Sequence, residues 1–338
     1  MDFGLLKASR ILVIRFSSLG DVILTTPLLK LLRQNFPNAR IDYCTKSSYA
    51  EVLTNNPNVD RIIPVDNDLD FNGLKNLKRL IRGNSYDLII DAHNNLRTFY
   101  IRFFSGTKTF KFRKYSLRKF LLVNFKINLM KKLPPIIERY CNILIPLLNE
   151  NIPHIMLPEI FTDDLSKQKV NILFQELNIP AASKLICIIP SAKHFTKTYP
   201  PEYFSELINK SDNCSFLLIG KGTDKKNIEL IKSKTGNNVY DLCDRLSVSE
   251  IAEVMKRCSL VISGDTGPMH IAESLNIPLI MIAGSSVMEF GFYPQSINST
   301  VIENKHLVCR PCSHIGKSEC PLKHFKCMRE IKPEEITF

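Results

Sequence analysis

A buried strand, a sharp turn and a helix follow one another without interruption in residues 260–275, and this run constrains the fold more than any other. Residues 260–263 are a short apolar, β-prone stretch that predicts a buried parallel strand. Gly264 and the residues after it interrupt that strand, and residues 269–275 have helical composition with Thr266 placed to cap them. A strand that runs straight into a helix is the repeating unit of a parallel α/β sheet.

The turn between that strand and helix also predicts an anion-binding site. Free N–H groups and the dipole at a helix N-terminus attract negative charge, and ligands of open α/β sheets bind at the carboxyl edge of the strands. Asp265, Thr266, Gly267 and His270 all fall at this position. Helix capping by Asp265 and Thr266 is the alternative that the turn by itself leaves open.

The alternation of strands and helices runs through the chain twice. Strands are predicted at residues 10–15, 41–44, 61–65 and 87–91, and again at 184–189, 215–219, 238–242 and 279–283. The first long helix is predicted to span residues 22–36 and to end before Pro37. This pattern predicts an α/β protein with two Rossmann-like, doubly wound domains, residues 1–155 and 156–338, joined by a linker near residues 150–162.

Composition is typical of a globular protein of the cytoplasm. The chain has 338 residues, enough for two domains, with 44% hydrophobic and 23% charged residues. No apolar run approaches the roughly 18–20 residues of a membrane span, and the N-terminus is a poor match to a signal peptide. Ten cysteines without such a signal indicate reduced thiols, so we expect a cytoplasmic location.

The net charge of +12 is spread unevenly along the sequence. Residues 1–160 hold 24 Lys and Arg against 13 Asp and Glu, whereas residues 161–338 hold 21 against 20. Residues 97–132 contain eleven Lys and Arg, no acidic residue and nine interleaved Phe and Tyr. This run suits a solvated basic face, an anionic membrane or glycolipid, or a single-stranded nucleic acid. No recognised nucleic-acid module accompanies it, so we expect no nucleic-acid partner.

Two further loops at predicted carboxyl edges carry candidate catalytic residues. Asp21 follows the first strand near a helix N-terminus, where it suits either helix capping or a general base that takes a proton from a hydroxyl. The loop after the strand at 184–189 is rich in hydroxyls and lysines, a composition that binds phosphates. Lys197 is preferred over Lys193 there because it lies closer to the helix that follows.

Four cysteines, Cys309, Cys312, Cys320 and Cys327, fall within 19 residues. The first pair has the Cys-x2-Cys spacing of a metal knuckle, and four thiolates suit a structural, tetrahedral zinc. Free thiols and disulfides are the alternatives. A catalytic metal is not expected at these cysteines, because all-sulfur metal sites are normally closed. We expect no cofactor for catalysis.

Three segments in the right order resemble glycosyltransferase family 9, the heptosyltransferases that build the inner core of lipopolysaccharide. Residues 15–27 (RFSSLGDVILTTP) look like the family's opening motif, and residues 263–272 (SGDTGPMHIA) look like its C-terminal motif. Residues 197–200 (KTYP) look like its Lys-x-Trp-Pro, with Tyr in place of Trp. Residues 309–331 are similar to the cysteine-bearing tail of many members, so the resemblance covers almost the whole chain.

This resemblance implies a GT-B fold, in which an N-terminal acceptor domain faces a C-terminal nucleotide-sugar domain across a cleft. It implies metal-independent, inverting transfer of a heptose from ADP-heptose to the lipopolysaccharide inner core. Asp21 would deprotonate the acceptor hydroxyl, and Lys197 would neutralise the leaving diphosphate. The donor site would be lined by Ser191, Ala192, Thr196, Leu246, Asp265, Thr266, Gly267 and His270.

The implied partners are the nucleotide-sugar donor and an anionic glycolipid acceptor, which place the protein at the inner face of the cytoplasmic membrane as a peripheral enzyme. Departures from the family pattern, such as Pro-Ser-Ala at residues 190–192, put the donor sugar in question. One alternative is a transferase that uses another nucleotide sugar for a surface glycan. The other is an inactive relative that binds nucleotide or lipid, although Asp21 and Lys197 together favour catalysis.

Overall fold

The computed structural model describes residues 8–103, 105–148, 152, 156–180 and 184–338. It divides into two compact units. The first unit comprises Met1–Tyr115 and Ile136–Phe161, and the second comprises Ser116–Pro135 and Thr162–Phe338. The sequence prediction places a single boundary between residues 155 and 156. In the structure, residues 116–135 belong to the second unit instead of the first, and the second unit resumes at Thr162. Part of the predicted linker, residues 150–151 and 153–155, lies outside the described residues.

The first unit is built on a parallel five-stranded sheet with the order β3-β2-β1-β4-β5. Its strands are β1 (Arg10–Ile14), β2 (Arg40–Lys46), β3 (Arg61–Val65), β4 (Leu88–Asp91) and β5 (Lys108–Lys111). Strand β1 pairs with both β2 and β4, and its four apolar residues from Ile11 to Ile14 are fully buried. The first four strands confirm the sequence prediction, whereas the edge strand β5 was not predicted.

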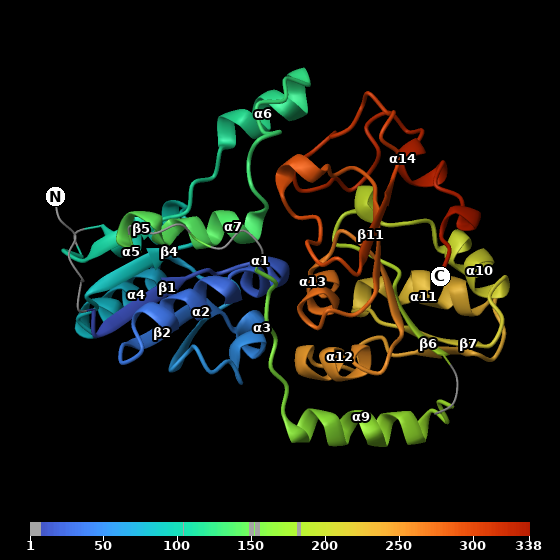
Figure 1. The fold of residues 1–338 in the computed structure, drawn as a ribbon, viewed down its shortest axis with the longest axis horizontal. Helices are drawn as coiled ribbons and strands as arrows, with labels where there is room; N and C mark the ends of the chain where they lie inside the picture. Colours follow the sequence, from blue (N-terminus) through green and yellow to red (C-terminus); the bar gives the residue numbers. More distant parts are fainter. Residues whose placement is uncertain (1–7, 104, 149–151, 153–155, 181–183) are drawn as a thin grey trace. The chain divides into compact units, whose positions relative to one another are not determined.

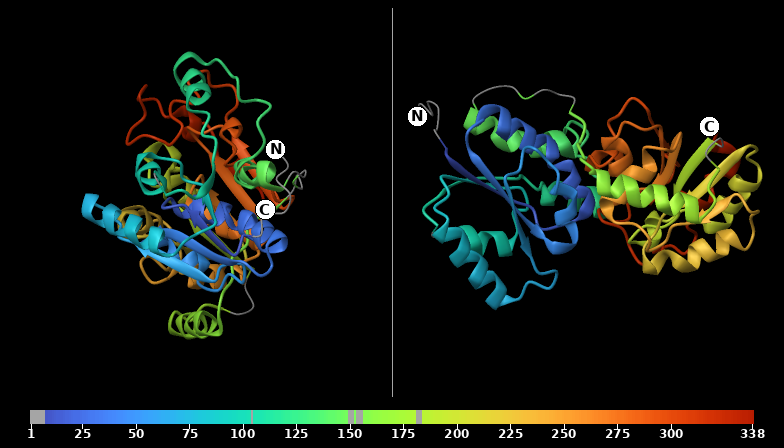
Figure 2. Two further views of the ribbon diagram at one scale, coloured as in Figure 1. Left: turned by 90° about the vertical axis from the view of Figure 1, so that its left-hand side faces the viewer. Right: turned by 90° about the horizontal axis from the view of Figure 1, so that it is seen from below.

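Helices cover both faces of this sheet (Figures 1 and 2). They are α1 (Leu19–Leu24), α2 (Thr26–Asn35), α3 (Ser47–Ala50), η1 (Glu51–Leu53), α4 (Phe71–Gly83), α5 (Leu96–Arg102), α7 (Ile136–Cys141), η2 (Asn142–Leu144) and α8 (Ile145–Leu148). The single helix predicted for residues 22–36 is wrong, because the chain breaks at Thr25. Pro27 has no N–H for an intrahelical bond, and the Thr25 and Thr26 hydroxyls donate to the Val22 and Ile23 carbonyls.

The second unit has a parallel six-stranded sheet with the order β11-β10-β9-β6-β7-β8. Its strands are β6 (Lys184–Ile189), β7 (Cys214–Leu218), β8 (Val239–Asp241), β9 (Leu260–Gly264), β10 (Leu279–Ala283) and β11 (Ser299–Glu303). Every strand except β11 confirms a predicted one. Strands β6 and β9 lie at the centre, so the loops that follow them meet at the carboxyl edge of the sheet.

The helices of this unit pack in two groups. Helices α10 (Pro201–Asn209) and α11 (Lys225–Lys232) pack together, and α12 (Val248–Met255) packs on α9 (Asp164–Glu176) and on α13 (Gly267–Ser274). The shorter elements are η3 (Phe195–Lys197), η4 (Gly222–Asp224), η5 (Met288–Phe290), α14 (Lys326–Arg329) and η6 (Pro333–Glu335). None of the helices in the described part of the chain is both long and apolar enough to cross a bilayer.

Residues 116–135 form an arm that belongs to the second unit although the sequence places it in the first half. The arm begins with α6 (Ser116–Phe125), which Figures 1 and 2 show carried on extended loops. Leu122 and Met130 of the arm are buried in one cluster with Phe290. Lys126 Nζ donates to the backbone carbonyls of Cys309 at 3.1 Å and of Pro311 at 2.7 Å.

The arm changes the charge map that the sequence predicts. The first unit contains 19 Lys and Arg against 13 Asp and Glu, and the second contains 26 against 20. Each unit therefore carries a formal charge of +6. The concentration of charge in the first half of the sequence is thus absent from the folded units, because the five basic residues of the arm fold with the second one.

Candidate active site

Asp21 lies at the carboxyl edge of β1, on the first turn of α1, and is held by four groups. Its Oδ1 is 2.7 Å from Arg15 NH2 and accepts a hydrogen bond from the Tyr140 hydroxyl at 2.8 Å. Its Oδ2 accepts from the Ser18 backbone N–H at 3.0 Å and from the Ser18 hydroxyl at 2.8 Å. The carboxylate therefore caps α1, as one of the two predicted roles requires, and its side chain still keeps 13% of its surface exposed.

The Asp21 carboxylate is ionised at any physiological pH. Burial alone would raise the pKa of Asp21, but the charge of Arg15 and the hydrogen bonds from Ser18 and Tyr140 outweigh it and lower the pKa from 3.8 to about 2. Arg15 is held in turn by a hydrogen bond from NH1 to the Ala92 carbonyl at 2.9 Å. Sequence reasoning missed Tyr140, which comes from α7 more than a hundred residues away and had no motif to mark it.

A second buried carboxylate lies at the same edge of the first sheet. Asp91 ends β4, is fully buried, and has Oδ2 at 3.2 Å from Arg102 Nε. Its other oxygen accepts from the backbone N–H groups of His93 and Asn94. Burial, together with the nearby charges of Arg15 and Lys114, lowers the pKa of His93 to about 3. The imidazole is therefore neutral at physiological pH beside an ionised Asp21.

In the second unit the structure brings two predicted residues into direct contact. Lys197 Nζ lies 2.6 Å from Asp265 Oδ2, and both side chains are largely buried. The Ser286 hydroxyl donates to the same carboxylate oxygen at 2.6 Å. These side chains come from the loops after β6, β9 and β10, which are neighbours in the sheet. Ser286 was not predicted, because nothing in the sequence links its serine pair to the turn at Asp265.

The Lys197 loop is fixed by close backbone packing. A Cβ at Gly264 would lie 2.5 Å from the Lys197 carbonyl oxygen, so only glycine allows β9 to approach the loop this closely. Thr196 accepts a hydrogen bond from the Lys317 N–H at 2.9 Å, and the Tyr199 hydroxyl donates to the Ile331 carbonyl at 2.9 Å. The cysteine-bearing tail, residues 309–331, thus holds the Lys197 loop in place through these two hydrogen bonds.

The remaining predicted donor residues lie at the same edge. Thr266 stands at the N-cap position of α13 without a capping hydrogen bond from its side chain, and Gly267 begins the helix, next to Asp265. His270 is buried one turn further on, with Nδ1 hydrogen-bonded to Glu273 Oε2 at 2.9 Å. Ser191, Ala192 and Leu246 follow β6 and β8, where the Asn227 amide donates to the Ser191 hydroxyl at 3.0 Å and the Ala192 N–H donates to Thr198. Their roles toward a donor stay predictions.

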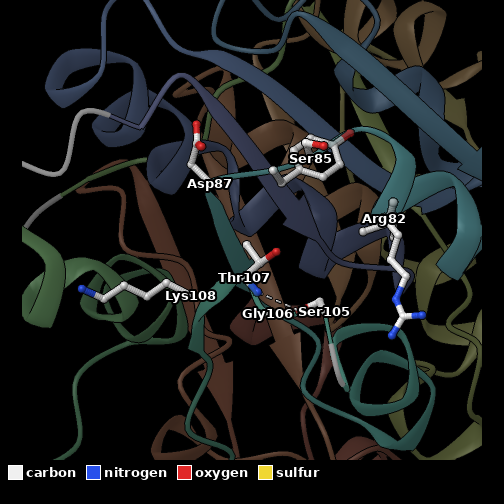
Figure 3. Close-up of a pocket in the computed structure, with 9 residues that line it drawn as sticks. Arg82, Ser85, Asp87, Ser105, Gly106, Thr107 and Lys108 are labelled. Carbon is white, nitrogen blue, oxygen red and sulfur yellow. Dashed lines mark hydrogen bonds between the residues drawn. The ribbon is translucent and has the colours of Figure 1, made fainter.

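A pocket elsewhere in the first unit is separate from these residues. Figure 3 shows it at the amino edge of the first sheet, where Asp87 precedes β4 and Lys108 begins β5. Asp87 is occupied there by hydrogen bonds from the backbone N–H groups of Ser9 and Arg10. None of the predicted site residues lines this pocket, and ligands of parallel sheets bind at the opposite edge.

The four clustered cysteines are free thiols, as are the other six. Burial, together with the neighbouring Cys312, raises the pKa of Cys327 to about 12. Within the described ranges, no three His, Cys, Asp or Glu side chains are arranged to hold a metal ion. The side chains of the four clustered cysteines are therefore not arranged as the ligands of a tetrahedral zinc, and no disulfide joins them. The structural zinc stays a prediction.

Comparison with known proteins identifies one family. The sequence profile of glycosyltransferase family 9 (heptosyltransferase) matches residues 74–323. Lipooligosaccharide heptosyltransferase 2 of Campylobacter jejuni subsp. jejuni is 28% identical over 159 residues, which cover 45% of this chain and about half, 49%, of that relative. Lipopolysaccharide heptosyltransferase 1 of Campylobacter coli is 23% identical over 344 aligned residues, covering 97% of this chain and 96% of the relative.

Solved structures share the fold of the whole chain. The glycosyl transferase family 9 protein of Veillonella parvula has a TM-score of 0.81 at 22% identity, covering 99% of this chain and 95% of that one. The E. coli ADP-heptose lps heptosyltransferase II has a TM-score of 0.75 at 20% identity, covering 96% and 95%. Together with the two parallel sheets, these similarities confirm the predicted GT-B class.

The low pKa of Asp21 predicts an acid-dependent contribution to stability. A pKa lowered from 3.8 to about 2 stabilises the folded state by about 2 kcal/mol at pH values above 3.8, and this contribution disappears as the pH falls toward 2. We expect the difference in unfolding free energy between wild type and Asp21→Asn to shrink over that window. Denaturant unfolding at a series of pH values measures it. A difference that stays constant with pH would contradict the pairing of Asp21 with Arg15.

The four clustered thiols generate a separate prediction. If Cys309, Cys312, Cys320 and Cys327 hold zinc, protein prepared under reducing, zinc-replete conditions carries about one equivalent, and chelation loosens the tail that contacts Thr196 and Tyr199. Metal analysis and limited proteolysis of the tail measure both effects. Protein without zinc under these conditions would leave the free thiols that the structure shows.

Proposed function

Because this chain belongs to glycosyltransferase family 9, the heptosyltransferases, we propose that it transfers a heptose from ADP-heptose to the inner core of lipopolysaccharide. The printed names of its relatives, lipopolysaccharide and lipooligosaccharide heptosyltransferases, support this substrate class. The name of the structural neighbour from E. coli supports ADP-heptose as the donor. The observation that carries the proposal is the buried pair of Lys197 and Asp265 at the N-terminus of α13.

The proposed donor site is the carboxyl edge of the second sheet. In this proposal the diphosphate of the donor binds beside Gly267, where the first N–H groups and the dipole of α13 attract negative charge. Lys197 supplies a full positive charge at the same place. In the absence of donor Asp265 neutralises that lysine. A diphosphate entering the site takes over the ammonium group, which leaves Asp265 with its hydrogen bond from Ser286 and able to accept from a hydroxyl of the donor.

The proposed reaction is a single inverting displacement. The oxygen of an acceptor hydroxyl forms a bond to the anomeric carbon while the bond from that carbon to the diphosphate oxygen breaks. The electron pair leaves with ADP, whose new charge Lys197 stabilises, and the acceptor proton passes to the Asp21 carboxylate. A carboxylate of low pKa suffices as base, because the hydroxyl becomes strongly acidic as its oxygen bonds to an oxocarbenium-like carbon.

The proposed acceptor is an anionic glycolipid. Arg15, His93 and Lys114 interact electrostatically with one another and with Asp21 at the edge of the first sheet. Such a site suits a hydroxyl-bearing sugar that carries acidic groups. An acceptor of this kind lies at the inner face of the cytoplasmic membrane, so we propose a cytoplasmic enzyme with peripheral membrane contact and no nucleic-acid partner.

The identity of the donor nucleotide is tested by ligand-induced stabilisation. We expect ADP and ADP-heptose to raise the melting temperature of the wild-type protein, and UDP and GDP to raise it less, because a ligand stabilises the state that binds it. A larger shift with UDP or GDP would assign another nucleotide sugar. Absence of any shift at millimolar nucleotide would contradict the donor site itself.

Lys197→Ala is expected to remove about 2–4 kcal/mol of transition-state stabilisation, the cost of losing one preorganised charged donor. This corresponds to a loss of roughly thirtyfold to nine-hundredfold in kcat. The matched control is Lys193→Ala, an exposed lysine of the same loop, which should keep wild-type turnover. Equal kinetics for the two variants would remove Lys197 from the mechanism.

Asp21→Asn keeps the shape of the side chain but cannot accept the acceptor proton. We expect roughly a hundredfold or greater loss of turnover, with ADP still stabilising the protein through the second unit. Asp91→Asn is the matched control, because it also removes the charge of a carboxylate paired with an arginine, but the Asp91 side chain has no exposed surface through which to reach an acceptor. An inactive relative would show ADP binding but no turnover even in the wild type. Similar turnover in Asp21→Asn and Asp91→Asn would assign Asp21 to capping alone.

A further inference from the structure

The arm, residues 116–135, presents a row of large apolar side chains to solvent. Leu117 is 70% exposed, Phe120 is 54% exposed and Phe125 is 61% exposed. Ile127 and Leu129, in the loop after α6, are each about half exposed, at 49% and 52%. Monomeric soluble proteins rarely gather so many exposed apolar side chains in twenty residues, and such gatherings mark interaction surfaces.

These side chains are exposed while the arm itself is anchored. Leu122 and Met130 are buried against Phe290, and the Asn128 amide donates to Glu289 at 2.7 Å. Lys126 is held by the Cys309 and Pro311 carbonyls. Leu117 and Phe120 are one helical turn apart and lie on the side of α6 away from Leu122. The outward apolar face is therefore a built feature of a docked element.

The charge of the arm selects the kind of partner. Its twenty residues contain five Lys and Arg and no acidic residue, whereas the rest of the second unit contains 21 against 20. Lys131 and Lys132 are exposed beside Leu129. Val308, next in sequence to the Cys309 whose carbonyl binds Lys126, is also 84% exposed. Exposed apolar groups bordered by positive charge match the headgroup region of an anionic bilayer.

We propose that the arm is the membrane-docking element of this protein, with Leu117, Phe120 and Phe125 entering the headgroup layer of an anionic bilayer. Lys131 and Lys132 contribute by attracting the acidic headgroups. Neither apolar burial by one short helix nor attraction by a few charges gives firm binding separately, and the arm combines both. A protein partner would leave the excess of positive charge unexplained, unless that partner were itself acidic.

This inference adds a membrane-binding surface to the proposed function. It rests on that function only in assuming that the enzyme works at a membrane. Docking through the arm brings a glycolipid-modifying enzyme to its acceptor. Vesicle binding needs neither donor nor acceptor sugar. Its failure is therefore distinguishable from failure of the proposed chemistry, which ADP stabilisation reports on the same protein sample.

The test is cosedimentation of the full chain with vesicles of phosphatidylglycerol and phosphatidylcholine in about equal amounts, and with vesicles of phosphatidylcholine alone. We expect binding to the anionic vesicles only, falling on the order of tenfold or more in Leu117→Ser/Phe120→Ser. Lys131→Glu/Lys132→Glu should lower binding by a similar factor, most strongly at low salt. All variants should keep the wild-type melting temperature and its shift with ADP.

The matched controls remove exposed residues of the same kinds elsewhere in the second unit. Leu165→Ser/Ile172→Ser alters two exposed apolar side chains on α9, and Lys167→Glu/Lys234→Glu reverses two exposed charges. Both should bind vesicles as the wild type does. Wild-type vesicle binding by the arm variants would overturn the proposal. So would absence of wild-type binding, or a concentration-dependent dimer lost in Leu117→Ser/Phe120→Ser, which would assign the face to a second copy.

Discussion

The ion pair between Arg15 and Asp21 is the constraint on which the first unit depends. Two charges taken out of water destabilise a fold unless they meet each other and find further hydrogen bonds. Here the guanidinium also donates to Ala92, and the carboxylate also accepts from Ser18 and Tyr140. The pair thereby joins the ends of β1 and β4 to α1 and α7. A group that only stabilised the fold would need no exposure, yet this carboxylate stays partly accessible at the edge where ligands bind.

The second unit also contains a largely buried ion pair, formed by Lys197 and Asp265. Lys197 is the positive group, and Asp265, the residue before the N-cap of α13, is its neutralising partner. Gly264 lets β9 approach the lysine loop, and the tail holds that loop through Thr196 and Tyr199. Asp265 thereby compensates the charge of Lys197 in the absence of a ligand.

The sequence predicts this site well where chemistry follows from local pattern. A strand that ends in Gly-Asp-Thr-Gly places Asp265 at a sheet edge, and short continuous apolar stretches predicted every central strand. The edge strands β5 and β11 escaped prediction because they are only half buried and lack such an apolar stretch. Tyr140 and Ser286 escaped for another reason: each reaches its aspartate through tertiary folding, and no spacing in the sequence records such a contact.

The arm shows why a charge profile along a sequence is not a charge map of a fold. Counted by sequence halves, the excess positive charge belongs to the N-terminal part. Counted by packed units, the two carry equal charge, because Leu122 and Met130 bury against Phe290 and carry five basic residues with them. Apolar packing, worth about 1.5–3 kcal/mol for each fully buried large side chain, outweighs the weak mutual repulsion of exposed lysines. The apolar packing of Leu122 and Met130 therefore determines which unit carries the basic residues of the arm.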